Sequence, residues 1–238
     1  MTPSLTVLYS GSKGNASVLS DGESAVLIDA GRSGRMLCRA LTAAGVAPEG
    51  LCAVFLTHEH CDHTAALNCL LSRCNIPVFA PESCVSAILR TAEPPLASAL
   101  VPIPPLFSHR MGGFSVSAFP TLHDSAGSVG YRFTFGAEDK IHTVGYATDL
   151  GAVTPEVEKG LLGCECVVIE SNYDEEMLTT GPYPPDLKRR IASRRGHLSN
   201  TDCAALAAFL AANGTAKFVL VHLSENNNLP ELALGEVG

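Results

Sequence analysis

The chain has 238 residues, of which 46% are apolar and 17% are charged, and this balance indicates a globular rather than a disordered protein. Its formal net charge of −8 argues mildly against broad, non-specific binding to nucleic acid. No apolar run is long enough to span a membrane, and the first residues lack the basic start and apolar core of a signal peptide. We therefore expect a cytoplasmic protein of one large or two small domains, without a membrane partner.

Short apolar runs rich in β-branched residues recur along the chain, each bounded by Gly, Pro, Asp, Asn or Ser, which is typical of strands. Between them lie longer segments with helical character. In chain order, the pattern predicts a strand at 4–10, a strand at 24–31, a helix at 34–44, strands at 52–58 and 76–80 around a helix at 65–74, a helix at 81–92, strands at 114–119, 129–135, 142–149 and 166–171, a helix at 200–212 and a strand at 217–222.

The ends of the last predicted helix carry clear signals. Ser199 or Asn200 suits its N-cap, and Asn213 followed by Gly214 suits its end. The proline-rich stretches 94–105 and 182–185 are expected to be loops. Strands that come first in hairpin-like pairs and then alternate with helices indicate an α/β fold whose sheets are covered by helices.

Nine cysteines are scattered through the chain without a paired CxxC motif, so a structural zinc knuckle is not expected. Most lie in apolar surroundings and are expected to be reduced and buried. Cys61 is the exception, because it lies inside a dense cluster of histidines.

That cluster is the stretch THEHCDHT, residues 57–64, which follows the apolar run LCAVFL. In an extended chain, residues i and i+2 lie on one side, so His58 and His60 can converge on one metal ion. Asp62 and His63 follow where the chain turns into the next helix and can serve a second ion. Glu59 is expected to point away and not to bind metal.

Two ions need more ligands than this cluster provides. Three further candidates each follow a predicted strand, where loops meet and active sites gather: His123, Asp149 and His222. Imidazole and carboxylate donors suit zinc, manganese or iron, so the identity of the metal stays open. Taken alone, each of these residues could equally be structural, and the cluster at 58–63 is what favours the metal interpretation. His109 and His142 are expected to be structural.

HEHCDH resembles the HxHxDH motif of the metallo-β-lactamase superfamily, and the order of Asp29, the cluster, His123, Asp149 and His222 matches along nearly the whole chain. The resemblance implies a single domain over residues 1–238 with the four-layer αββα sandwich of that superfamily. It implies two divalent metal ions, with Asp149 bridging them and Asp29 fixing the cluster's loop without binding metal. By motif match, one ion is held by His58, His60 and His123, and the other by Asp62, His63 and His222.

Within the superfamily, SGSKGN, HDSAGSVGYRF, GHLSN and VHLSENNN resemble the YycJ/WalJ group of bacterial metallohydrolases, described as nucleases that act on DNA. GHLSNTDCAALAAFL also resembles the segment of ribonuclease Z that carries a histidine beyond the metal ligands, which corresponds to His197. The glutamate partner of that histidine corresponds to Glu170. The long arm of ribonuclease Z and the inserted domain of the β-CASP nucleases are missing from the sequence.

The resemblance predicts a DNA exonuclease. Two ions about 3.5–4 Å apart can share a hydroxide and clamp a phosphate. Asp62 is expected to bind metal and to orient the water, and His197, oriented by Glu170, to give a proton to the leaving oxygen. The basic run DLKRRIASRRGH supplies Arg194 and Arg195 as possible phosphate contacts, although a solvated helix face would look the same. Ser12, Lys13 and Asn15 could contact a phosphate or form an ordinary turn.

Two other functions remain open from the sequence. One is a small-molecule hydrolase of the same fold, acting on an ester, thioester, lactone or cyclic phosphodiester, which the acidic charge favours slightly. The other is a non-catalytic metal-binding module, which the full ligand set disfavours. The sequence leaves open the direction of DNA degradation, exonuclease versus endonuclease action and the oligomeric state.

Overall fold

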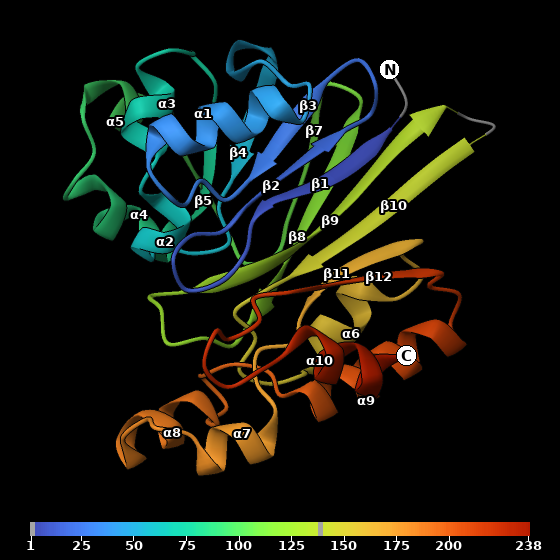
Figure 1. Ribbon diagram of the computed structural model, residues 1–238. Coiled ribbons are helices and arrows are strands. Elements are labelled where there is room, and N and C mark those ends of the chain that lie inside the picture. Colours follow the sequence, from blue (N-terminus) through green and yellow to red (C-terminus); the bar gives the residue numbers. More distant parts are fainter. Residues whose placement is uncertain (1–2, 138–139) are drawn as a thin grey trace. The chain divides into compact units, whose positions relative to one another are not determined.

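The computed structural model describes residues 3–137 and 140–238, and the chain divides into two compact units. Unit 1 comprises Met1–Val116 and Ser125–Gly127, and unit 2 comprises Ser117–Asp124 and Ser128–Gly238. Unit 1 contains one six-stranded sheet, most of a second six-stranded sheet lies in unit 2, and each unit carries helices of its own (Figure 1). The expectation of a single domain over the whole chain stays a prediction.

The sheet of unit 1 begins as an antiparallel hairpin meander and continues as a parallel sheet. β1–β2 and β2–β3 pair antiparallel, whereas β3–β4, β4–β5 and β5–β6 pair parallel. Because parallel strands are buried on both faces, β3 and β5 read as continuous apolar runs with every residue buried. The strands, in sheet order, are β1 (Ser4–Tyr9), β2 (Ala16–Ser20), β3 (Ala25–Ile28), β4 (Leu51–Phe55), β5 (Val78–Pro81) and β6 (Leu100–Ile103).

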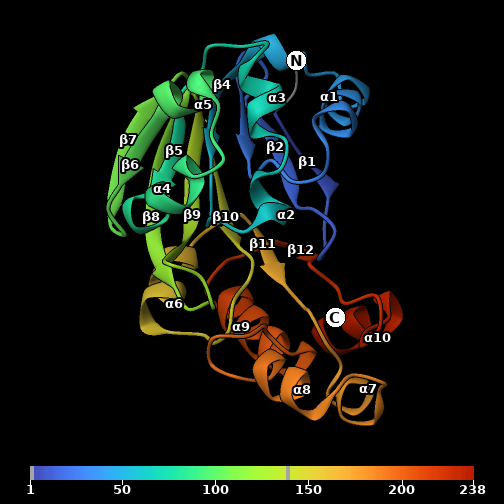
Figure 2. The same cartoon turned by 90° about the vertical axis from the view of Figure 1, so that its left-hand side faces the viewer.

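Helices cover one face of this sheet, as Figure 2 shows from the side of α3 and α4. Ser33 caps α1 by accepting a hydrogen bond from the amide of Met36 at 3.4 Å. Leu37 and Leu41 of α1 are fully buried against the sheet core, and burying such a side chain contributes about 1.5–3 kcal/mol. The helices are α1 (Gly34–Ala43), α2 (Cys61–Thr64), α3 (Leu67–Leu71), α4 (Glu82–Leu89) and α5 (Pro94–Ala99), with a 3₁₀ turn at Pro48–Gly50.

The second sheet has the order β12-β11-β10-β9-β8-β7, and all of it except β7 and the first residues of β8 falls in unit 2. β9 and β10 pair antiparallel, while β10–β11 and β11–β12 pair parallel. As a result, β11 lies between β10 and β12, and the carboxyl ends of these three strands meet at one edge. The strands are β7 (Phe107–Met111), β8 (Phe114–Thr121), β9 (Ser128–Ala137), β10 (Lys140–Ala147), β11 (Cys166–Glu170) and β12 (Lys217–Val221).

The helices of unit 2 begin at well-formed caps. Ser199 accepts from the amide of Asp202 at 3.1 Å, and Asp174 accepts from that of Met177 at 2.8 Å. Buried residues of α6 and α9 pack on the sheet in one apolar cluster. The helices are α6 (Pro155–Leu161), α7 (Glu175–Thr180), α8 (Pro185–Ile191), α9 (Asn200–Ala212) and α10 (Pro230–Val237).

Several local predictions were wrong. The stretch 94–105 is not a loop but contains α5 and β6, and α8 begins at Pro185 inside the second proline-rich stretch. The reason is that proline, whose φ is preset, is favoured in the first turn of a helix. The segment 65–74 starts earlier than predicted, as α2 and α3, and β4 ends at Phe55, so residues 58–60 form a loop and not a strand.

Two mixed sheets flanked by helices are the content expected of the α/β, αββα fold class. The nine cysteines all fall in the described ranges, where each is a free thiol, and Cys61 is exposed. No helix in the described part of the chain has the length and apolar character to cross a membrane.

Candidate active site

A buried carboxylate just after β3 organises the candidate metal-binding loop of unit 1, residues 57–63. Asp29 accepts hydrogen bonds from the amide of Thr57 at 2.8 Å and from its hydroxyl at 3.0 Å. It also accepts one from Nδ1 of His63 at 2.8 Å. Because a carboxylate only accepts, His63 carries its proton on Nδ1 and leaves Nε2 available to a metal ion. Asp29 therefore links Thr57 to His63, and its predicted role beside a metal site stays a prediction.

Asn15 contacts this same nitrogen of His63. Its amide nitrogen lies 2.9 Å from Nε2 of His63 and donates to Oδ2 of Asp62 at 3.3 Å. Its amide oxygen accepts from the backbone of Gly11 at 2.8 Å, which fixes the orientation of the amide. Asn15 is thus buried beside two predicted metal ligands, whereas Ser12 in the same turn is exposed. A direct contact of Asn15 or Ser12 with substrate stays a prediction.

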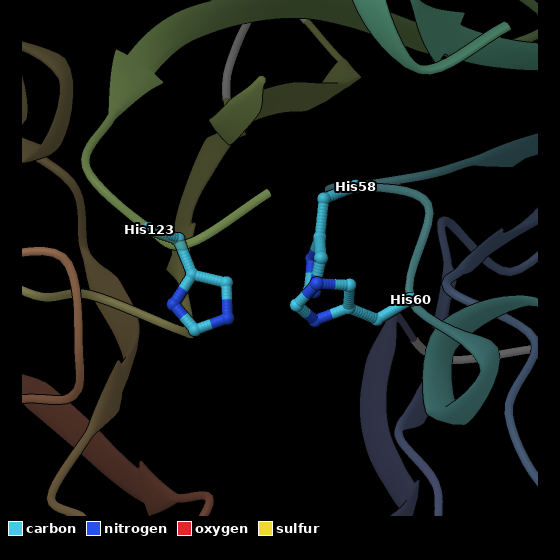
Figure 3. A group of neighbouring side chains, drawn as sticks. All are labelled: His58, His60 and His123. Atoms are coloured by element: carbon cyan, nitrogen blue, oxygen red, sulfur yellow. The ribbon is translucent and has the colours of Figure 1, made fainter. Parts of the chain in front are cut away.

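His58 and His60 lie in the loop between β4 and α2 (Figure 3). Their rings meet edge-on, with centroids 4.4 Å apart and an angle of 76° between the planes. The ring of His58 also lies 4.1 Å from that of His63, centroid to centroid. The loop therefore gathers three imidazoles and the carboxylate of Asp62, whose Oδ2 is 3.6 Å from Nε2 of His63.

Glu59 is turned away from these ligands, as expected, and binds elsewhere in unit 1. Its Oε1 accepts from the amide of Ala126 at 2.8 Å, and its Oε2 accepts from the thiol of Cys84 at 2.9 Å. Cys84 also lies 2.8 Å from the carbonyl oxygen of Gly127. Glu59 thus ties the candidate metal-binding loop to α4 and to residues 125–127.

In unit 2, His123 follows β8 (Figure 3), and two hydrogen bonds hold it in place. Its Nδ1 donates to the carbonyl oxygen of Gly196 at 3.0 Å, so here too Nε2 is the nitrogen left available to a metal ion. Its own carbonyl oxygen accepts from Nε of Arg195 at 3.1 Å. Gly196 must be glycine, because a Cβ there would lie 2.1 Å from the carbonyl oxygen of Ile191.

Glu170, at the end of β11, is the central residue of unit 2's cluster. It is fully buried, and its Oε1 accepts from Nδ1 of His197 at 2.8 Å and from Nδ1 of His222 at 2.7 Å. Its Oε2 accepts from the amides of Leu150 at 2.6 Å and Leu198 at 3.1 Å. One carboxylate therefore sets the tautomer of two histidines and joins the loops that follow β10 and precede α9.

The charges of this cluster depend on one another. Burial alone raises the pKa of Glu170, but the charge and hydrogen bond of His197 and the bond from His222 lower it, to about 2. Burial alone lowers the pKa of His197, but the Glu170 carboxylate raises it, to about 9. The pKa of His222 is raised in the same way, by Asp149 and Glu170 against its burial. Burial lowers the pKa of His123.

Asp149 completes the cluster after β10. Its Oδ1 lies 3.7 Å from Nε2 of His123 and 3.6 Å from Nδ1 of His222. Asp149, Glu170, His197 and His222 each offer a donor atom, and these atoms lie within 4.8 Å of one another. Such a set of imidazole and carboxylate donors fits a divalent ion.

Three of the predicted site residues share an unusual backbone conformation, with a positive φ. Asp29, Asp149 and His222, each just after a strand, have φ values of 58°, 53° and 58°. The left-handed region is sparsely populated by residues other than glycine and is concentrated at functional sites. The strain therefore falls at the strand ends that carry the candidate chemistry.

The structure thus gathers the predicted ligands into one group on each unit. Unit 1 brings together His58, His60, Asp62 and His63 around Asp29, and unit 2 brings together His123, Asp149 and His222 around Glu170 and His197. Arg194 and Arg195 are exposed, and the Arg195 side chain supports His123. The assignment of each residue to metal or substrate stays a prediction.

Sequence reasoning missed three supporting residues. Thr57, whose amide donates to Asp29, adjoins the candidate ligand His58. Asn172 closely follows Glu170, and its amide donates to the carbonyl oxygen of His222 at 2.7 Å. Both residues could have been found by their position next to a candidate. The contact of Asn15 with His63 was not anticipated, and its predicted contact with substrate stays a prediction. No signal pointed to Gly196, because its contribution is a backbone carbonyl.

Comparisons with known proteins agree with this architecture. Residues 24–223 match the family described as "Beta-lactamase superfamily domain". The solved structure of the metallo-β-lactamase fold protein YhfI from Bacillus subtilis superposes with a TM-score of 0.74 at 19% identity, covering 98% of this chain and 90% of that one. The short form of human tRNase Z gives 0.68 at 19% identity, covering 93% of each chain. The predicted αββα fold class is confirmed.

Two curated relatives are more similar in sequence to this chain than these solved structures are. Exodeoxyribonuclease YycJ of Bacillus anthracis is 33% identical over 232 residues, 96% of this chain and 85% of that protein. Exodeoxyribonuclease WalJ of Streptococcus pneumoniae is 32% identical over 232 residues, 96% of this chain and 84% of that protein. The predicted family is confirmed: the chain belongs to the β-lactamase superfamily and, within it, resembles the YycJ/WalJ group of metal-dependent hydrolases.

Proposed function

We propose that the protein is a phosphodiesterase that degrades DNA as an exonuclease with two divalent metal ions. The names of its curated relatives and the two groups of donors support this proposal. Asp149 would bridge the ions, which are zinc, manganese or iron. One ion would be held by His58, His60 and His123, and the other by Asp62, His63 and His222.

The histidines of this chain fit such ions. Nδ1 of His63, His123 and His222 is taken in each case by a carboxylate or a carbonyl oxygen. This outer contact raises the basicity of Nε2 and fixes the ring, as in most metal-binding histidines. When bound, a pair of ions supplies an activated water and neutralises charge on the phosphate.

The observation that carries the proposal is the pair formed by His197 and Glu170, joined at 2.8 Å. The alkoxide that leaves a phosphodiester needs a proton, and hydrolysis of a β-lactam or thioester depends less on one. Glu170 fixes Nδ1 of His197, so Nε2 is the atom that donates, and the raised pKa of His197 keeps the ring protonated near neutral pH. Asp62 would orient the attacking water.

The test compares substrates and one variant. Protein loaded with Mn²⁺ or Zn²⁺ is expected to shorten end-labelled DNA from a terminus. His197→Gln removes the proton donor and is expected to lower kcat about 10²–10⁴-fold, with the metal content by mass spectrometry unchanged. Metal-loaded protein that leaves DNA and RNA intact but hydrolyses a thioester, lactone or small ester would refute the proposal.

A further inference from the structure

A pocket in unit 1 opens beside His60 and is not used by the site described above. Its volume is about 550 Å³, within the range of about 300–1,000 Å³ that is usual for small-molecule sites. The candidate metal-binding loop forms one wall through His60 and Cys61, and α3, α4 and the start of α5 form the others. Figure 2 shows these helices together on unit 1.

The far wall of the pocket is apolar and firmly built. Leu67, Ile88 and Leu96 are buried and line it. Asn68 secures the rim, because its amide nitrogen donates to the carbonyl oxygen of Thr91 at 2.9 Å and its amide oxygen accepts from the backbone of Glu93 at 2.9 Å. The shape of the pocket is therefore set by hydrogen bonds within the unit.

A cationic side chain, that of Arg90, lies at the rim of the pocket. Arg90 is exposed at the end of α4, and its guanidinium makes no hydrogen bond or ion pair with any residue in 3–137 or 140–238. The one carboxylate on the lining, that of Glu59, is held by Ala126 and Cys84. An unpaired guanidinium beside an apolar wall suits a ligand with both a planar apolar face and a phosphate.

We propose that this pocket binds the nucleotide of the substrate strand that adjoins the scissile phosphate. Its base lies against Ile88 and Leu96, and Arg90 pairs with the next phosphate along the strand. This inference rests on the proposed function, because His60 marks the reaction centre only if it binds metal. The pocket then selects a nucleotide chain over a simple phosphodiester.

The experiment compares two substrates with the Mn²⁺-loaded protein: a labelled oligodeoxynucleotide, and bis(p-nitrophenyl) phosphate, which has neither a base nor a second phosphate. Arg90→Gln is expected to lower kcat/KM for the oligonucleotide about tenfold relative to that for the small diester, through KM. It should also reduce the salt dependence of oligonucleotide binding by about one unit of slope. Arg110→Gln, an exposed arginine of β7 outside the pocket, is the matched control and should change neither.

A second variant tests the pocket without the charge. Ala87→Leu fills the space beside Ile88 and should raise KM for the oligonucleotide more than for the small diester. The pocket assignment is refuted if Arg90→Gln and Ala87→Leu each change kcat/KM equally for the two substrates, or if they change it no more than Arg110→Gln does. The proposed function would still stand. Wild-type protein that hydrolyses neither substrate refutes the proposed function itself.

Discussion

Replacing Glu170 by glutamine isolates the charge of the buried carboxylate. The variant Glu170→Gln keeps the shape of the side chain, and its amide oxygen can still accept from the backbone of Leu150 and Leu198. Its amide NH₂ now faces Nδ1 of both His197 and His222. His222 must then move its proton from Nδ1 to Nε2, where it would block metal binding, and His197 must give up its Nδ1 proton.

The expected size of the effect follows from these contacts. Two charge-assisted hydrogen bonds, each worth about 1.5–3 kcal/mol, become neutral ones worth about 0.5–1.5 kcal/mol, so metal-free protein should lose about 2–3 kcal/mol of stability. Metal affinity should fall about 10–100-fold, as for other outer partners of ligand histidines. Urea unfolding measures the first quantity, and competition with a chromophoric chelator measures the second.

The matched control is Glu165→Gln. Glu165 also accepts from a histidine, His142, at 2.7 Å, but its side chain is 40% exposed. Since exposed ion pairs contribute about 0–1 kcal/mol, this variant should change stability little and metal affinity not at all. If the two glutamine variants behave alike, or if Glu170→Gln binds metal as tightly as the wild type, the role assigned to Glu170 is wrong.

Three further outcomes are expected. Asp29→Asn, which removes the carboxylate that holds a ligand histidine, should weaken metal binding about 10–100-fold in the same chelator competition. Gly31→Ala places a Cβ 2.0 Å from the carbonyl oxygen of Asp62, so the backbone must shift, and the free energy of unfolding in urea should fall by about 1–3 kcal/mol. Gly50→Ala is the control: its Cβ would have open space around it, and the free energy of unfolding should stay close to that of the wild type. In chelator-treated protein, the raised pKa of His197, about 9, means that its contribution to stability is complete below about pH 6.5 and is lost as the pH rises through 9. A urea midpoint that stays constant over that range would contradict this assignment.

The sequence predicts helices and strands most accurately where the signals, such as capping residues, are local. The helix at 200–212 has the predicted bounds, because Ser199 and Asn213 mark its ends by capping. The strands that precede Asp29 and His222 were also found, since their apolar runs stop at polar residues. By contrast, β2, β6 and β7 were missed, and a proline at 102 inside β6 resembles a loop signal.

The arrangement of the candidate site depends on sheet order, which a single sequence does not specify. Glu170 can bond both His197 and His222 because β11 pairs with β12 on one side and β10 on the other. The strand carrying Glu170 could be recognised, but not its neighbours. For the same reason, the pairing of Glu170 with His197 came from resemblance, and its second partner came only with the structure.

The left-handed backbone at Asp29, Asp149 and His222 has a consequence for mutagenesis. At such a position any residue with a Cβ carries a conformational penalty of about 1–2 kcal/mol. Alanine therefore removes the donor atom but leaves the backbone strain of the native residue in place. Glycine removes the donor and relaxes the turn, while asparagine keeps the turn and most of the shape. The difference between glycine and alanine at each site would separate the cost of bending the main chain from the value of the side chain.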